Sequence, residues 1–182
     1  MTYTVDQFGP SDLLTSRKFD TRRIKHEVGK TSFFEGREFR VFKDFDIPAG
    51  QTETIKVTST SDSIVEVFGA SLVLGSLRIE LVTGGTDGDD FSSELPIFQT
   101  NRTTASPVLT PSVTMVNGGT HTGGTVSDVI LLVAGSPARQ AREVTATEER
   151  PLGFAPGTFY IRLISTGSAN AEGVFRARWE EI

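Results

Sequence analysis

Short runs of alternating apolar and polar residues, separated by glycine- and proline-rich turns, limit this chain to very few folds. In the clearest run, Leu77, Ile79 and Leu81 alternate with Arg78 and Glu80. Successive side chains of a β-strand point to opposite faces, so this period predicts a strand with one buried face. Comparable apolar runs lie at residues 39–41, 55–57, 64–68, 95–98, 113–116, 159–163 and 175–179.

The segments between these runs carry turn signals. Pro48-Ala49-Gly50-Gln51 and Asn117-Gly118 are typical of turns, and Pro96 predicts an edge or irregular position. Residues 126–133 are compatible with a buried strand or a short helix, and their β-branched content and flanking glycines favour the strand. Residues 136–150 are a helix-compatible polar stretch, where we expect a long loop with at most one helical turn.

The pattern predicts an all-β domain over residues 33–182, an antiparallel β-sandwich that is jelly-roll-like. Short strands at a spacing of about 8–12 residues, without an amphipathic helix, are typical of such folds. A chain of 182 residues is long enough for one domain with a real core. We expect the runs at 39–41 and 55–57 to pair as a hairpin, and those at 159–163 and 175–179 to form a closing hairpin.

Composition excludes several classes of chemistry. The chain has no cysteine, which rules out disulfides, thiolate zinc sites and thiol catalysis. No apolar run approaches the ~20 residues that a membrane-spanning helix needs. The first residues also lack the basic and apolar regions of a signal peptide. We therefore expect no membrane partner.

Residues 1–32 differ from the rest because they show no sustained period. We interpret them as an extended N-terminal arm, with an ordered edge strand as the alternative. Residues 17–30 carry a net charge of +4 in a chain of net charge −5, so the remainder is acidic and should not attract nucleic acid through its general field. The candidate partner-binding residues of the arm are Arg17, Lys18, Arg22, Arg23, Lys25 and Lys30. These residues could bind an acidic protein surface or the phosphates of a nucleic acid. A solvated tail that binds no partner is the third possibility.

Two local patterns suggest ligand sites but also have simpler interpretations. Gly29-Lys30-Thr31 looks like the end of a phosphate-binding loop, yet Ile24 stands where that motif requires its first glycine. Asp87, Asp89 and Asp90 offer oxygen ligands of the kind that Ca²⁺ prefers, although their spacing does not match an EF-hand. We expect no nucleotide site, and we interpret the acidic stretch as a solvated loop whose capacity for a cation stays open.

Catalytic residues are equally hard to find. His26 and His121 are the two histidines, and neither lies near a Gly-x-Ser-x-Gly motif. We place His26 in the arm and His121 in a glycine-rich surface loop. Trp179 alternates with Phe175, which favours a core or interface position over a sugar-binding platform. We expect a protein that is not an enzyme and that needs no cofactor and no metal.

Several segments of residues 33–182 resemble small structural proteins of tailed bacteriophages. They are residues 33–40 (FFEGREFR), 45–51 (FDIPAGQ), 118–125 (GGTHTGGT), 156–163 (PGTFYIRL) and 173–181 (GVFRARWEE). These segments are structural rather than chemical, so the resemblance implies a role in the virion and no active site. Residues 1–32 do not take part in this resemblance.

The resemblance implies a capsid decoration or cement protein on the capsid exterior, assembled in the cytoplasm of a bacterial host. It further implies a homotrimer whose partner is the major capsid protein or another virion protein. On this hypothesis the arm reaches neighbouring subunits, and its positive charge speeds encounter with an acidic surface. Two alternatives remain: a tail or fibre-anchoring protein, and a carbohydrate-binding or glycan-cleaving jelly-roll module.

Overall fold

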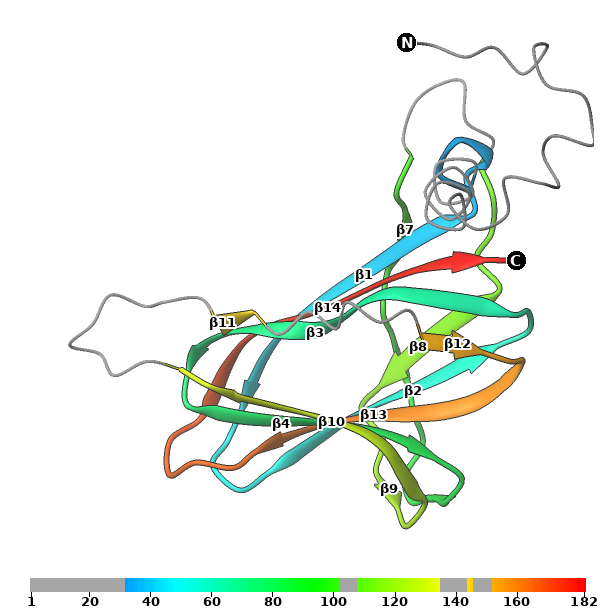
Figure 1. The fold of residues 1–182 in the computed structure, drawn as a ribbon. Helices are drawn as coiled ribbons and strands as arrows, with labels where there is room; N and C mark the ends of the chain where they lie inside the picture. The colour runs from blue at the N-terminus through cyan, green and yellow to red at the C-terminus, as the bar shows by residue number, and fades with distance from the viewer. Residues whose placement is uncertain (1–31, 102–107, 135–143, 146–151) are drawn as a thin grey trace, which may run out of the picture.

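A computed structural model describes residues 32–101, 108–134, 144–145 and 152–182 of the chain. Two antiparallel sheets pack face to face, and we name them the upper and lower sheets from their places in Figure 1. The upper sheet has the order β11-β3-β14-β1-β7, with β12 also paired to β3. The lower sheet has the order β10-β4-β13-β2-β8-β6. The predicted all-β sandwich is confirmed, whereas residues 1–31 of the expected arm lie outside the described residues.

The strands of the upper sheet are β1 (Glu38–Ile47), β3 (Ser63–Leu74), β7 (Ile97–Gln99), β11 (Val144–Thr145), β12 (Leu152–Phe154) and β14 (Ala171–Glu181). Those of the lower sheet are β2 (Thr52–Ser59), β4 (Ser76–Thr83), β6 (Ser93–Glu94), β8 (Val113–Asn117), β10 (Thr125–Val133) and β13 (Gly157–Ser165). A separate two-stranded ribbon pairs β5 (Thr86–Asp87) with β9 (His121–Thr122).

The strand order is that of a jelly roll. The chain crosses between the sheets at almost every step, from β1 in the upper sheet to β2 in the lower, then to β3 and back to β4. After β10 it returns to the upper sheet in β11 and β12, crosses to β13, and ends in β14 between β3 and β1. Residues 84–124 are inserted between β4 and β10, and they supply β7 at one margin of the upper sheet, β6 and β8 at one margin of the lower sheet, and the β5–β9 ribbon.

This crossing corrects both predicted hairpins. The run at 39–41 lies in β1 and pairs with β14, whereas the run at 55–57 lies in β2 and pairs with β13. The runs at 159–163 and 175–179 likewise belong to different sheets. Residues 126–133, in contrast, are strand as predicted. Within 136–150 the structure describes only Val144–Thr145, which is strand, and the rest of that expected loop lies outside the described residues.

The core fills the space between the two sheets, where the long strands send their alternate apolar side chains. Trp179 of β14 is 2% exposed and stacks on Phe39 of β1, with ring centroids 6.0 Å apart. Phe68 and Phe175 meet edge to face at 5.9 Å. The prediction that Trp179 belongs to the core is therefore confirmed. Within the described ranges, no helix is long and apolar enough to span a membrane.

Candidate functional site

The predicted arm residues cannot be placed in a site. Arg17, Lys18, Arg22, Arg23, Lys25 and Lys30 all lie outside the described residues, as does His26. Three other features of the described residues are candidates for a functional site. They are a polar network on the lower sheet, a small interior cavity, and an apolar stripe on β10.

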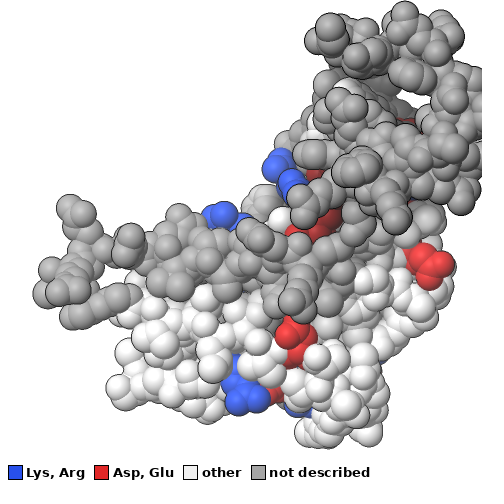
Figure 2. All heavy atoms as spheres, in the orientation of Figure 1, with Lys and Arg blue, Asp and Glu red and all other residues white. Residues whose placement is uncertain are grey.

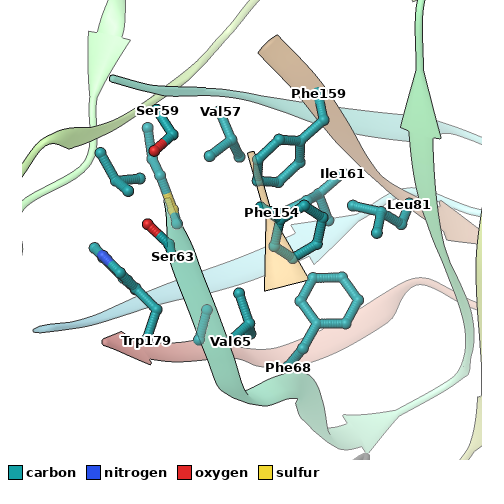
Figure 3. A pocket seen from close by; sticks show the side chains of 13 residues that line it. Val57, Ser59, Ser63, Val65, Phe68, Leu81, Phe154, Phe159, Ile161 and Trp179 are labelled. Carbon is teal, nitrogen blue, oxygen red and sulfur yellow. The ribbon is translucent and has the colours of Figure 1, made fainter. Parts of the chain in front are cut away.

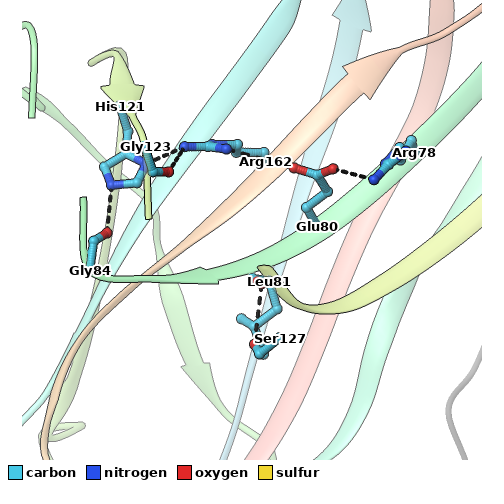
Figure 4. A network of polar contacts seen from close by, with 8 residues as sticks. All are labelled: Arg78, Glu80, Leu81, Gly84, His121, Gly123, Ser127 and Arg162. Carbon is cyan, nitrogen blue, oxygen red and sulfur yellow. Dashed lines mark hydrogen bonds and ion pairs between the residues drawn. The ribbon is translucent and has the colours of Figure 1, made fainter. Parts of the chain in front are cut away.

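The polar network is centred on His121 of β9 and links four chain segments (Figure 4). One ring nitrogen, Nε2, lies 2.9 Å from the Gly84 carbonyl oxygen, and the other, Nδ1, lies 2.9 Å from Nη2 of Arg162. A guanidinium group can only donate hydrogen bonds, so Nδ1 must accept and Nε2 must carry the proton. His121 is therefore neutral in this arrangement, with both nitrogens engaged.

Arg162 of β13 extends the network into the lower sheet. Its Nη2 also donates to the Gly123 carbonyl oxygen at 2.5 Å, and its Nη1 lies 3.7 Å from the Glu80 carboxylate. Arg78 completes the chain with an ion pair to Glu80 at 2.7 Å. The Glu80 side chain is 8% exposed, and a buried carboxylate of this kind is tolerated because two arginines neutralise it.

A second set of contacts fixes the same ribbon through Tyr160. His121 stacks on the Tyr160 ring with centroids 3.6 Å apart and planes at 16°. Burial raises the pKa of Tyr160, and a hydrogen bond to Asp87 adds to that rise. Lys56 of β2 reaches Asp87 at 2.6 Å, and this contact lowers the pKa of the Asp87 carboxyl and raises that of the Lys56 ammonium.

These contacts correct the expectation that His121 sits in an exposed surface loop. Its side chain is 8% exposed because the insertion folds back over the outer face of the lower sheet. Gly85 makes the close approach possible, since a Cβ there would lie 2.4 Å from His121 Nε2. The glycines flanking His121 in the sequence were the one signal that this segment packs tightly. With both nitrogens bound, the ring ties the ribbon to the lower sheet.

The acidic stretch at 87–90 is exposed, as expected of a solvated loop. Asp87 is nevertheless tied to Lys56, and Asp89 accepts a hydrogen bond of 3.0 Å from the Thr120 hydroxyl. Among the described residues, no group of three or more His, Asp or Glu side chains is placed to hold a metal ion. The geometry of the described residues therefore does not support a cation site at this loop.

The interior cavity lies between the sheets and is lined mainly by apolar side chains (Figure 3). Phe154 and Phe159 stack at its margin with centroids 4.5 Å apart. Its volume of about 20 Å³ is close to that of a single water site, far below the ~300–1,000 Å³ of ordinary ligand pockets. The cavity is thus a packing gap of the core. Trp179, which lines it, has no exposed face for a sugar.

The apolar stripe lies on β10, the terminal strand of the lower sheet. Val129, Leu131 and Val133 are 41%, 68% and 65% exposed, and they alternate with the buried Ile130 and Leu132. Figure 2, drawn from the same side as Figure 1, shows uncharged atoms over much of β10 and β4, with a few charged side chains among them. We call Val129, Leu131 and Val133 the β10 stripe.

Sequence reasoning did not single out the β10 stripe. Residues 129–133 are apolar at every position, which is typical of a strand buried on both faces. Its outward side chains remain exposed because the insertion covers the Tyr160 side of the lower sheet and the described residues leave β10 open. Comparisons with protein-family models, curated proteins and solved structures found no match to this chain.

Proposed function

We propose that this protein is a non-enzymatic structural protein of a bacteriophage virion, a capsid decoration protein that assembles as a homo-oligomer. The β10 stripe carries the proposal. Monomeric proteins rarely leave contiguous apolar side chains on a terminal strand, because such an edge invites association with another chain. An apolar stripe of this kind makes physical sense where another copy or a neighbouring subunit covers it.

Two further observations support a structural role. The jelly roll is a rigid scaffold whose loop ribbon is tied to the lower sheet by His121, Arg162 and Tyr160. The segments that resemble phage structural proteins lie on this scaffold, including the 118–125 loop that contains His121. Rigidity of loops suits a protein that presents a fixed surface to a lattice, since less conformational entropy is lost on docking.

The basic arm supplies the second half of the proposal. Its positively charged residues would approach an acidic capsid surface, and its ordering would be coupled to binding. A deletion through Lys30 tests this role in purified particles. We expect the deleted protein to decorate capsids at clearly lower occupancy than the full chain. Decoration at wild-type occupancy would show that the arm is dispensable.

Copy number separates the capsid location from the tail alternative. Quantitative mass spectrometry of purified particles should find this chain at the copy number of a capsid lattice position. A copy number of about a dozen or fewer would place it in the tail or at a fibre anchor. Absence from the particles would overturn the virion assignment.

Self-association through the β10 stripe is tested on the isolated protein. Leu131→Asp places a charge at the centre of the stripe, and we expect it to reduce the assembly to monomers in light scattering after size exclusion. Val108→Asp is the matched control, because Val108 is 93% exposed and precedes β8, which three strands separate from β10 in the lower sheet. An unchanged mass for Leu131→Asp, or a monomeric wild type, would remove the stripe as the self-association contact.

A further inference from the structure

The strand that carries the β10 stripe also has a free backbone edge. Among the described residues, β10 is the terminal strand of the lower sheet and pairs only with β4. A terminal strand presents backbone N–H and C=O groups along its outer edge, and another chain can pair with them. β10 is nine residues long, and Asp128 is its single charged residue. The strand therefore has neither the lysines nor the prolines that commonly protect such an edge.

The hydrogen bonds around β4 show which residues of β10 face that edge. The N–H of Ala134 donates to the Gly75 carbonyl oxygen at 2.9 Å. The next residue along β4, Ser76, accepts instead from the N–H of Thr166 at 3.0 Å, on the β13 side. Ser76 lies opposite Val133, and alternate residues of an antiparallel pair direct both backbone groups toward the partner strand. The three residues of the β10 stripe therefore direct their N–H and C=O groups away from β4.

A contact within β10 agrees with this alternation. The N–H of Val129 donates to Asp128 Oδ1 at 2.7 Å, as is expected of an amide that does not face β4. The residues whose backbone groups face the edge are thus the same ones whose side chains are exposed on the outer face of the sheet. A chain that pairs with this edge would therefore meet the β10 stripe as well.

The edge segment is nearly the same in both directions, since residues 129–133 have the sequence Val-Ile-Leu-Leu-Val. Two antiparallel copies related by a two-fold axis at Leu131 would place that residue opposite itself and Val129 opposite Val133. Each of these three pairs joins residues that face the edge, so each pair can form two hydrogen bonds. Paired side chains lie on the same face, where all three pairs are apolar. A shift by one residue would instead oppose edge-facing groups with groups that face β4.

We propose that two copies of this protein pair through their β10 edges, antiparallel and with Leu131 opposite itself, so that their lower sheets form one continuous sheet. The inference rests on the proposed function, which assigns self-association to the β10 stripe. A second copy is the occupant because the edge matches itself in both backbone groups and side chains. Asp128 then lies opposite Ala134 at the end of the paired segment, so no charge opposes a like charge. A two-fold contact of this kind closes on two copies and makes the isolated protein a dimer.

Single cysteines test the register, because the chain has no cysteine of its own. Opposed Cα atoms of a hydrogen-bonded antiparallel pair lie about 5.5 Å apart, a distance that a disulfide can span. We expect Leu131→Cys to form a covalent dimer on mild oxidation. Val129→Cys and Val133→Cys should each fail to cross-link alone, because equivalent residues lie about 14 Å apart, but should cross-link when mixed. Val108→Cys, at a site that is 93% exposed, is the matched control for random collision.

Amide hydrogen exchange of the unmodified protein tests the backbone pairing itself. The N–H groups of Leu131 and Val133 should exchange about tenfold more slowly in the dimer than after dilution to the monomer. A contact made by side chains alone would leave both exchange rates unchanged.

The outcomes separate this inference from the proposed function. A dimer in which Leu131→Cys cross-links no better than Val108→Cys, with unchanged exchange at Leu131 and Val133, would overturn the edge pairing and leave self-association through the stripe intact. A trimer in light scattering would also overturn the two-fold contact. A monomeric wild type would overturn both the edge pairing and the self-association, whereas the virion assignment is decided by copy number in particles.

Discussion

Replacing His121 with alanine tests whether the polar network holds the β5–β9 ribbon on the lower sheet. The change removes a ring that stacks on Tyr160 at 3.6 Å and is 8% exposed. It also removes the donor to the Gly84 carbonyl oxygen and the acceptor for Arg162. Each lost contact leaves its partner without the group that it had bound in the folded protein.

The expected cost follows from these contacts. Stacked rings contribute about 0.5–1.5 kcal/mol beyond their buried area. Each of the two hydrogen bonds contributes a further ~0.5–1.5 kcal/mol. We therefore expect His121→Ala to lower the free energy of unfolding by about 1.5–4.5 kcal/mol. His121→Phe retains a ring over Tyr160 without either hydrogen bond, so the difference between the two variants isolates the stacking contribution.

Urea unfolding provides the global measurement, because Trp179 is the single tryptophan and is buried in the core. Amide hydrogen exchange in β5 and β9 provides the local one, since a ribbon that opens without unfolding the sandwich exchanges faster. Nitrogen chemical shifts of His121 should also report a neutral ring protonated at Nε2. A loss below about 0.5 kcal/mol, with unchanged exchange in both strands, would refute the role assigned to the network.

Two further predictions concern the scaffold. Gly75→Ala should lower the free energy of unfolding by about 2–4 kcal/mol, because φ is +81° and a Cβ would lie 2.1 Å from the Asn170 carbonyl oxygen. Gly50→Ala, at φ +74° in open space, should cost only about 1 kcal/mol, and equal losses would contradict this account. Burial raises the pKa of Glu180, so its stabilising contribution is full in acid and is lost as pH rises through the folded-state pKa. Glu180→Gln should therefore flatten the fall in stability from mildly acidic to neutral pH, and a slope that matches the wild type in urea titrations would contradict this.

The strands themselves could be predicted because their signal is local. The alternation of Leu77, Ile79 and Leu81 requires only that successive side chains point to opposite faces. The same reasoning placed Trp179 in the core, where it is 2% exposed. Neighbourhood in the sequence, however, wrongly suggested that adjacent runs pair as hairpins. Alternation of apolar and polar residues shows which face of a strand is buried. It does not show which other strand pairs with it.

His121 shows why the site was harder to predict than the fold. Its glycine-rich surroundings suggest an exposed loop, and its burial arises only because the insertion returns to the outer face of the lower sheet. Tyr160 points outward from β13, yet it is 7% exposed for the same reason. Such burial depends on contacts between residues about forty positions apart, which leave no periodic trace in either segment.

The amino-acid sequence alone therefore determined that this chain forms an all-β sandwich, where its main strands run, and which of their faces enter the core. These properties follow from backbone geometry and apolar burial within short segments. The tertiary structure decided which strands are neighbours, and with them the terminal position of β10 and the exposure of the β10 stripe. Both features come from long-range pairing, whose free energy is shared among distant segments and cannot be read from any one of them.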